Sequence, residues 1–376
     1  MIPFPGTFYW RNKARSVPLF ILISLSVAVI GVVATLTGSI LESIYSAEVR
    51  PFEHFTLLIS KELMISECTM RPLLDNPSIR LLVPFLDSSI RTKGFLGSER
   101  RRVYALPGES MDFVLDALSL ELTAGRLPIP GSNEIVLHES IINSRNLAIG
   151  SFVGQEVDQA DYLWGLFEVS GVISGPVPIG AASFEYFKQQ WMFELGDNAY
   201  ALMAFPTTVV QKMNETFPTD IHERLLIRDY DYAFESYQSE SREMDLLLWV
   251  VNIAIIGIIS LSMGMLNTIH FLTRMKEYGI LTLIGLDLNT LLRRTFLEVL
   301  ILSLWGFMGG IIISWVLTWV VSKHIFSPRG IQVGIYSFRY LIYTLPIPLF
   351  LTVFSFLTIW WNIRQLDVIA VIEGRD

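Results

Sequence analysis

Apolar residues are concentrated in four long runs that contain no charged side chain. The first run, residues 17–38, has about 22 residues and would rise roughly 33 Å as an α-helix, enough to cross the hydrocarbon core of a bilayer. The same criterion is met by residues 246–271, 299–321 and 340–361. The last run contains Pro346 and Pro348, which predict a kink or a broken turn. The pattern predicts an integral membrane α-helical protein with four transmembrane helices.

Basic residues beside these runs predict the orientation of the chain, because short cytoplasmic flanks are enriched in Lys and Arg. If both termini are cytoplasmic, the inner flanks hold Arg11, Lys13, Arg15, Arg274, Lys276, Arg293, Arg294, Arg364 and Arg375. The short outer loop then holds only Lys323, Arg329 and Arg339. This balance favours a multi-pass protein of the cell membrane with cytoplasmic termini. A cleaved signal peptide is the alternative for the first run, but that run exceeds the usual length of about 7 to 15 residues and no A-x-A site follows it.

The runs divide the chain into successive segments. These are an amphipathic cytoplasmic N-terminus (1–16), transmembrane helix 1 (17–38), an extracytoplasmic domain ending in a stalk helix (39–244), transmembrane helix 2 (245–271), a cytoplasmic loop (272–294), transmembrane helix 3 (295–321), a short outer loop (322–339), transmembrane helix 4 (340–361) and a cytoplasmic tail (362–376).

Between residues 39 and 244 the pattern changes to short apolar runs separated by turn residues and helical stretches, which predicts an α+β domain. Strands are expected at residues 54–60, 79–85, 101–107, 134–138, 167–174, 200–205 and 224–228. Helices are expected at residues 61–74, 112–122 and 183–195. Residues 235–244 are polar and continue without a helix breaker into the second membrane run, so we expect a stalk helix that is continuous with it.

Composition and charge agree with this division. Hydrophobic residues make up 52% of the chain and charged residues only 17%, so lipid must cover part of the surface. Residues 42–243 carry 29 acidic and 16 basic side chains, an excess that disfavours nucleic-acid binding. Cys68 is the single cysteine, so no intramolecular disulfide can form and the outer domain must be stabilised by its core.

The sequence contains little that indicates catalysis. Its histidines are far apart and form no HExxH or similar metal-ligand pattern: His54, His138, His222, His270 and His324. No GxxxxGK[ST] phosphate loop and no GxSxG nucleophile elbow occur, and Cys68 has no histidine nearby in the sequence. We therefore expect no catalytic, cofactor or metal site in this chain. Trp164, Phe167, Trp191 and Met192 could line a substrate surface, but at this spacing a place in the core is the stronger interpretation.

A short basic and amphipathic segment follows the second membrane run. One face of a helix there would be apolar, formed by Ile280, Leu281, Leu283 and Ile284. Arg274, Lys276 and Glu277 would remain available to water or to a protein partner. The alternative is a solvated turn that has no role beyond reversing the chain.

A longer pattern extends from this segment. It reads Arg274-x-x-Glu277-x-Gly279-Ile280-Leu281-x-x-Ile284-Gly285, followed by Glu298 and then by Gly306, Gly309 and Gly310. Matching features elsewhere are the Arg11 to Ser16 lead-in, Gly125-Arg126-Leu127-Pro128, Asn133-Glu134-Ile135-Val136-Leu137, Leu147-Ala148-Ile149-Gly150 and the tail after the last run. In this order, on a frame of four spans with the large loop after the first, they resemble the permeases of the MacB, LolC and FtsX superfamily of ABC transporters.

The resemblance implies roles for several of these residues. Residues 272–294 would be the coupling-helix loop, and ATPase coupling would fall to Arg274, Lys276, Glu277, Gly279, Leu281 and Gly285. Gly306, Gly309 and Gly310 would let helices pack closely, either within the protomer or across a dimer. Glu298, near the cytoplasmic face, would be an interface residue or a functional one. Gly125 and Gly150 would serve turns of the outer domain.

The resemblance also implies the partners and the activity. A separate ABC ATPase subunit would bind ATP and Mg, while this chain would hold no cofactor and would not be an enzyme. A second permease copy or paralogue would complete a dimer in the lipid bilayer, and an extracytoplasmic adaptor or hydrolase is a possible further partner. The outer domain is expected to be of the MacB periplasmic type, moved by mechanotransmission.

Three functions follow from these features. The principal hypothesis is efflux of a lipophilic, peptide or antibiotic-like substrate. The first alternative is an FtsX-like transmembrane regulator of cell-wall hydrolases. The second alternative is a membrane-tethered sensor, which would need a cytoplasmic module larger than the loops leave room for.

Overall fold

The computed structural model describes residues 13–60, 71, 75, 77, 79–94, 97–190, 199–204, 225–285, 287–327 and 342–364. The chain forms two compact units. The membrane unit comprises Met1–Gly38, Glu243–Val321 and Gly334–Asp376, and the α/β unit comprises Ser39–Arg242 and Ser322–Val333.

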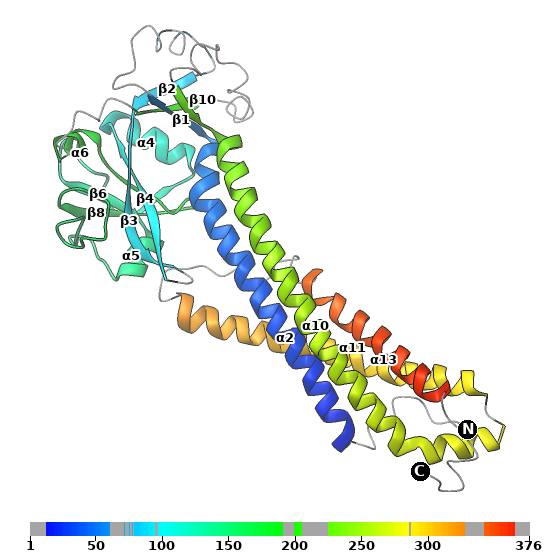
Figure 1. Ribbon diagram of the computed structural model, residues 1–376. Helices are drawn as coiled ribbons and strands as arrows, with labels where there is room; N and C mark the ends of the chain where they lie inside the picture. The colour runs from blue at the N-terminus through cyan, green and yellow to red at the C-terminus, as the bar shows by residue number, and fades with distance from the viewer. Residues whose placement is uncertain are drawn as a thin grey trace. The chain divides into compact units, whose positions relative to one another are not determined.

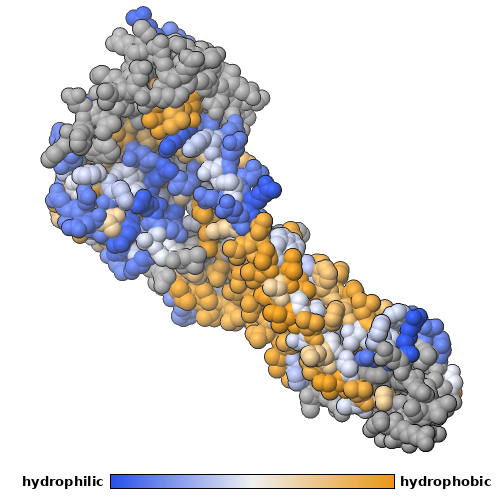
Figure 2. Space-filling view, in the orientation of Figure 1, coloured by the Kyte–Doolittle hydropathy of each residue, from blue (hydrophilic) through white to orange (hydrophobic). Residues whose placement is uncertain are grey.

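Long apolar helices make up the membrane unit (Figure 1). Their bounds are α2 (Lys13–Ile44), α10 (Tyr230–Leu283), α11 (Leu288–Val321) and α13 (Pro346–Arg364). Stretches long and apolar enough to cross a membrane lie within Ser16–Glu53, Tyr230–Leu266, Leu292–Phe326 and Ile342–Asn362. The predicted four transmembrane helices are thus confirmed, and Figure 2 shows hydrophobic side chains gathered over these helices.

Side chains of these helices divide between a shared core and an outward apolar surface. Ile23 and Val27 of α2 and Met263 of α10 are fully covered in the core. By contrast, Ile253 and Met265 of α10 have 65% and 72% of their surface exposed. Such outward apolar side chains are suited to lipid, because acyl chains are as apolar as they are.

The last span is interrupted near its start. Residues 342–344 are helical, a turn falls at Leu345, and α13 begins at Pro346. Proline is well suited to a first helical position, because its missing N–H would have no partner there. The broken turn expected from Pro346 and Pro348 is present.

The segment between the second and third spans differs from the expected loop. Instead of a separate short helix within residues 272–294, α10 continues to Leu283 and α11 begins at Leu288. The chain reverses at Ile284 and Gly285, where Gly285 has φ +94°. Residues 273–283 contain no proline to end the helix, and a left-handed glycine is a common helix terminator. The expected loop is therefore mostly a continuation of the two long helices.

Two sheets form the framework of the α/β unit in the described residues. The smaller sheet is antiparallel in the order β11 (Leu225–Arg228), β1 (Phe55–Ser60), β10 (Ala199–Ala204) and β2 (Ile79–Pro84). The larger sheet is mixed, in the order β3 (Leu86–Lys93), β4 (Ser98–Leu106), β9 (Gly180–Ser183), β6 (Glu134–His138), β8 (Phe167–Ser174) and β5 (Glu121–Gly125), with β7 (Phe152–Val153) on β8. The predicted α+β domain is confirmed.

Two separate cores lie on opposite faces of the larger sheet. Along β4, Tyr104 and Leu106 belong to one core, while Val103 and Ala105 belong to the other. Successive strand residues point to opposite faces, so both faces of this strand are covered. The first core includes α4 (Gly108–Ala117) and the smaller sheet, and the second includes α5 (Glu139–Arg145) and α6 (Phe184–Gln190).

Each of the seven expected strands overlaps a strand of the structure, but four strands and α5 of the described residues were not predicted. The unpredicted strands are β3, β5, β7 and β9. The helix expected at 112–122 is α4, which begins and ends earlier. It stops because Ser119 has φ +54° and Leu120 N–H donates to Leu115 O, the pattern of a left-handed helix cap. The helix expected at 61–74 lies largely outside the described residues.

Candidate functional site

The predicted ATPase-coupling residues gather around the reversal between α10 and α11. Arg274, Lys276, Glu277, Gly279 and Leu281 lie on the last turns of α10, and Gly285 lies in the reversal itself. Two apolar side chains beside them are open to solvent, since Ile280 and Ile284 are 55% and 75% exposed. Residues four apart share one helix face, so two exposed apolar side chains on one face accompany the predicted coupling residues.

Glu298 lies on α11 close after this reversal. Its side chain is 2% exposed, and Oε1 lies 3.4 Å from Nε of Arg294, one helical turn earlier. An ion pair four residues apart shields the carboxylate from a fully apolar environment. Glu298 is thus a buried, paired residue within α11, the helix that follows the predicted coupling segment.

Gly306, Gly309 and Gly310 face α2 within the same protomer. A Cβ at Gly306 would lie 2.7 Å from Cγ2 of Ile23, and one at Gly310 would lie 2.5 Å from Cβ of Val27. The Ser24 hydroxyl donates a hydrogen bond to Gly306 O at 3.0 Å. We call Gly306, Gly309 and Gly310 the glycine ridge. It brings the backbones of two membrane helices close together, as small residues commonly do in membranes.

Polar side chains join α10 to the last span in the same unit. Asn252 Nδ2 donates to Tyr343 O at 2.7 Å, and the Tyr343 hydroxyl donates to Asp245 Oδ1 at 2.8 Å. Further along the pair, Asn362 Nδ2 donates to Thr268 Oγ1 at 3.3 Å. Hydrogen bonds between membrane helices contribute to their association. Periodicity did not indicate these residues, because single polar positions within an apolar run do not reveal their partners.

A charged cluster in the α/β unit was also missed by the sequence patterns. Arg102 of β4 bridges Asp87 of β3 and Glu48 of the π-helix η1 (Tyr45–Val49), which follows α2. Burial works against the charge of Arg102, but Asp87 and Glu48 outweigh it and raise the pKa of the guanidinium above its usual value. Beside it, Arg101 donates to Ser43 Oγ at 2.9 Å. These contacts tie the end of α2 and the π-helix η1 that follows it to the larger sheet.

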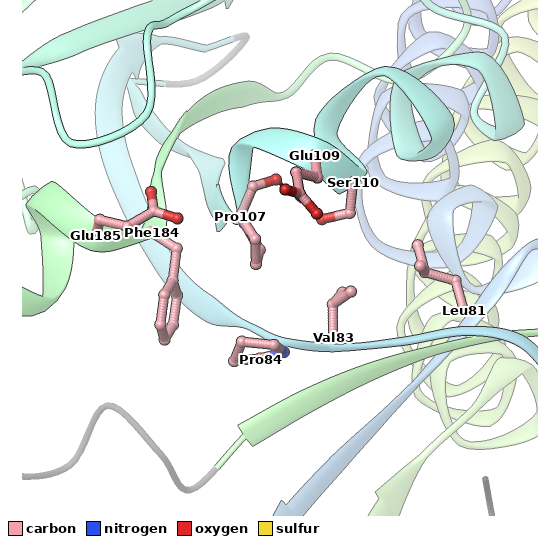
Figure 3. Close-up of a pocket in the computed structure, with 8 residues that line it drawn as sticks. All are labelled: Leu81, Val83, Pro84, Pro107, Glu109, Ser110, Phe184 and Glu185. Atoms are coloured by element: carbon pink, nitrogen blue, oxygen red, sulfur yellow. Dashed lines mark hydrogen bonds between the residues drawn. The ribbon is translucent and has the colours of Figure 1, made fainter.

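An open pocket of about 630 Å³ lies beside strand β2 of the α/β unit. Figure 3 shows Pro107, Glu109 and Ser110 at the start of α4 and Phe184 and Glu185 at the start of α6, opposite the strand residues Leu81, Val83 and Pro84. Its lining is mainly apolar with two carboxylates. Such a lining suits an apolar ligand or a ligand with a basic group.

The aromatic and histidine positions raised by the sequence fall in different environments. Phe167 is fully buried in the second core, as expected, whereas Trp164 is 52% exposed. His138 is buried and caps α5, with Nδ1 accepting from Ser140 N–H and Nε2 placed 3.1 Å from Gly175 O. In the described part of the chain, no group of three or more His, Cys, Asp and Glu side chains is placed to hold a metal ion. Trp191, Met192, Cys68 and His222 lie outside the described residues.

The two outer glycines occupy turns with positive φ. Gly125 has φ +78°, and a Cβ there would lie 2.2 Å from Ser170 O. Gly150 has φ +88° with no atom within 4 Å of such a Cβ. Gly125 is therefore required by both conformation and close backbone approach, and Gly150 by conformation alone.

Comparisons with known proteins identify the membrane part. Residues 249–368 match the family model of the FtsX-like permease C-terminal domain. This stretch begins within α10 and runs through α11 and α13, so it includes the predicted coupling residues and the glycine ridge. No curated protein matches the chain.

Three solved structures have a low similarity to the chain. The periplasmic region of MacB from Actinobacillus actinomycetemcomitans is 15% identical, with a TM-score of 0.33, covering 50% of this chain and 95% of that one. The extracellular domain of the noncanonic ABC-type transporter YknZ from Gram-positive bacteria is 10% identical, with a TM-score of 0.30, covering 46% and 100%. A domain of a putative permease protein from Porphyromonas gingivalis is 10% identical, with a TM-score of 0.26, covering 47% and 88%.

The family match agrees with the signature at residues 274–310 and with the four membrane spans around it. The chain therefore carries an FtsX-like permease C-terminal domain over residues 249–368.

Proposed function

We propose that this chain is the membrane subunit of an ABC complex and that it transmits movement from a separate ATPase to its α/β unit. ATP and Mg would bind to the ATPase, because the sequence holds no phosphate loop. The ATPase would contact the α10–α11 reversal through the basic and acidic signature residues and the exposed face of Ile280 and Ile284. Both termini and this reversal would then face the cytoplasm.

The observation that carries the proposal is the continuity of α10. A single helix runs from Tyr230 to Leu283, with the coupling residues in its last turns. Its first turns are held in the α/β unit, where Ala233 is part of the first core and Tyr230 packs against it. A helix without a break transmits an axial shift or a rotation more faithfully than a jointed linker, because each residue is hydrogen-bonded to the next turn.

Contacts within the α/β unit offer a route from the helix ends into the sheet. Tyr45, just after α2, meets Tyr237 of α10 edge to face, with ring centroids 5.3 Å apart. From the same π-helix, Glu48 pairs with Arg102 of β4. A displacement of these helix ends would therefore reach the larger sheet through paired side chains.

The proposed substrate is lipophilic, peptidic or antibiotic-like, and the proposed direction is export. The pocket beside β2 supports this class, since its walls are mainly apolar and carry Glu109 and Glu185. A second permease copy or paralogue would complete the complex, as in related ABC systems.

The proposal can be tested by replacing one carboxylate in the last turns of α10 and, as a control, another carboxylate earlier in the same helix. The full-length chain, with its single cysteine moved to an exposed position of the α/β unit, would be purified with its ATPase in nanodiscs. Glu277→Gln lies in the coupling segment, and Glu243→Gln makes the same change on an exposed position of the same helix. Two quantities would be measured in the same sample: the rate of ATP hydrolysis, and the distance between fluorescent labels on the α/β units of the two permease copies.

We expect ATP to change the distance in the unaltered protein and in Glu243→Gln. In Glu277→Gln the distance change should be lost while the protein remains in the membrane. Equal distance changes in Glu277→Gln and Glu243→Gln would show that Glu277 is not needed to transmit the movement, and would contradict the proposed role of this segment. Failure of any nucleotide-hydrolysing protein to co-purify with the chain would refute the proposal as a whole.

A further inference from the structure

A second pocket of the α/β unit is lined by neutral amides around an exposed tryptophan. Its volume is about 570 Å³, and it is bordered by Gln155, Glu156, Gln159, Trp164, Gly165 and Gln190. Half of the Trp164 surface is open to solvent, at 52%. An indole that is left exposed beside several hydrogen-bonding side chains is unusual, because tryptophan is normally among the well-buried residues.

The loop that presents Trp164 is held rigidly from within. Leu163, the preceding residue, is fully buried, and its carbonyl accepts from Gln155 N–H at 2.8 Å. The side chain of Asp161 is completely covered, and it accepts from Arg91 N–H at 2.8 Å and from Arg145 Nη1 at 2.6 Å. The loop is therefore ordered before any ligand binds, so binding costs little conformational entropy.

Glycine at position 165 shapes the floor of this pocket. Its φ is +102°, and a Cβ there would lie only 3.0 Å from Cγ of Gln190. The absence of a side chain lets Gln190, at the end of α6, lie against the loop. The loop and the helix thus place their amides around one space.

We propose that this pocket binds an uncharged saccharide. The negative face of an indole attracts the positively polarised C–H groups on the apolar face of a sugar ring. Each glutamine offers both a donor and an acceptor, and Glu156 offers acceptors, which matches the hydroxyl groups around the rim of a sugar. None of the six described residues that line the pocket is a cation that could hold a phosphate or sulfate, so a neutral glycan fits better than an anionic one.

The amide lining also favours a saccharide over a protein partner. Protein hot spots are apolar or aromatic anchors in desolvated surroundings, whereas three of the six residues around this pocket are glutamines. A protein would have to pair each of these amides on binding or leave it buried and unsatisfied. A sugar carries a hydroxyl group at nearly every carbon, so it can form hydrogen bonds with several of these amides at once.

The test uses the full-length protein in nanodiscs, titrated calorimetrically with tetraacetylchitotetraose and with maltotetraose. At least one should bind with a dissociation constant of ~1 mM or tighter, since one stacked ring and a few hydrogen bonds can supply that affinity. Trp164→Ala should weaken binding by about tenfold or more, and Trp164→Phe by less, because a ring is retained. Gln155→Ala and Gln190→Ala should each weaken it severalfold without touching the ring.

The matched control is Phe152→Ala, which removes another exposed aromatic side chain of the same unit, 46% exposed and outside the pocket. This variant should bind as the unaltered protein does. Absence of binding by both sugars would overturn the proposal, and so would equal affinities of Trp164→Ala and Phe152→Ala. Capture of a protein that depends on Trp164, with no sugar binding, would also overturn it in favour of a protein interface.

Discussion

Substituting the glycine ridge provides a direct measure of how closely α2 and α11 must approach. In Gly310→Ala the new Cβ would lie 2.5 Å from Cβ of Val27 and 2.8 Å from the carbonyl oxygen of Ser24. Carbon atoms in contact prefer about 3.5 to 4.0 Å, so the helices must separate by roughly 1 Å or shift past each other. Neither obstacle can rotate away, because one is a backbone atom and the other is a branched carbon next to the backbone.

The expected cost follows from two opposing effects. Overpacking of this kind costs about 1 to 3 kcal/mol, whereas replacing glycine by alanine in a helix gains about 0.5 to 1 kcal/mol. Gly310→Ala should therefore lower the free energy of unfolding by about 1 to 2 kcal/mol. Gly309→Ala should be milder, because the new Cβ would meet the end of the Phe20 ring and the Ser24 hydroxyl, which can move.

Gly257 supplies the matched control. It lies on the membrane helix α10, and a Cβ there would meet no atom within 4 Å, so Gly257→Ala should be neutral or slightly stabilising. The free energy of unfolding of each full-length variant can be measured in mixed micelles with increasing SDS. We expect the value for Gly310→Ala to be about 2 kcal/mol below the value for Gly257→Ala. If Gly310→Ala proved as stable as Gly257→Ala, the close contact between α2 and α11 would be wrong.

Two further predictions concern the α/β unit. Burial lowers the pKa of His138, whose Nε2 faces Gly175 O. Its contribution to stability is therefore complete above the unfolded pKa of about 6.5 and is lost as the pH falls. In His138→Asn the melting temperature should fall less steeply as the pH is lowered below about 6.5. An unchanged dependence of the melting temperature on pH would show that His138 is not the residue responsible. Asp161→Asn should lower the unfolding free energy by about 3 kcal/mol because it breaks a buried pair with Arg145. Asp158→Asn, at a partly exposed carboxylate, should cost less than about 1 kcal/mol in the same denaturant titration.

The parts of the fold that the sequence predicted are those with strong local patterns. Membrane spans need only an uninterrupted apolar run, and β6 carries the short apolar run Ile-Val-Leu, which is buried on both faces of the sheet. Strand β3 was missed because it reads Leu-Asp-Ser-Ser-Ile-Arg-Thr-Lys, in which buried Ser88 and Thr92 alternate with polar neighbours. Its position is set by pairing with β4, which no local pattern records.

The candidate site was predictable only as far as its residues lie close in the sequence. The spacing of the glycine ridge predicted a close helix contact, but its partner helix is far away, since Ser24 and Gly306 are 282 positions apart. The bridge of Arg102 to Glu48 spans 54 positions. Arginine and glutamate are ordinary surface residues in a sequence, so their burial and pairing become visible only with the tertiary structure.

The contacts between membrane helices indicate which of them can move in the proposed mechanism. Helices α2 and α11 meet through backbone atoms at the glycine ridge, where a sliding movement would create clashes at once. Helix α10 meets the last span through side chains such as Asn252 and Asn362, which can follow a small shift by changing rotamer. If movement starts at the α10–α11 reversal, it is therefore α10 that can shift while α2 and α11 remain a fixed pair. The predicted coupling residues lie on the last turns of that same helix, so in the proposed mechanism the helix best able to move is the one that the ATPase would contact.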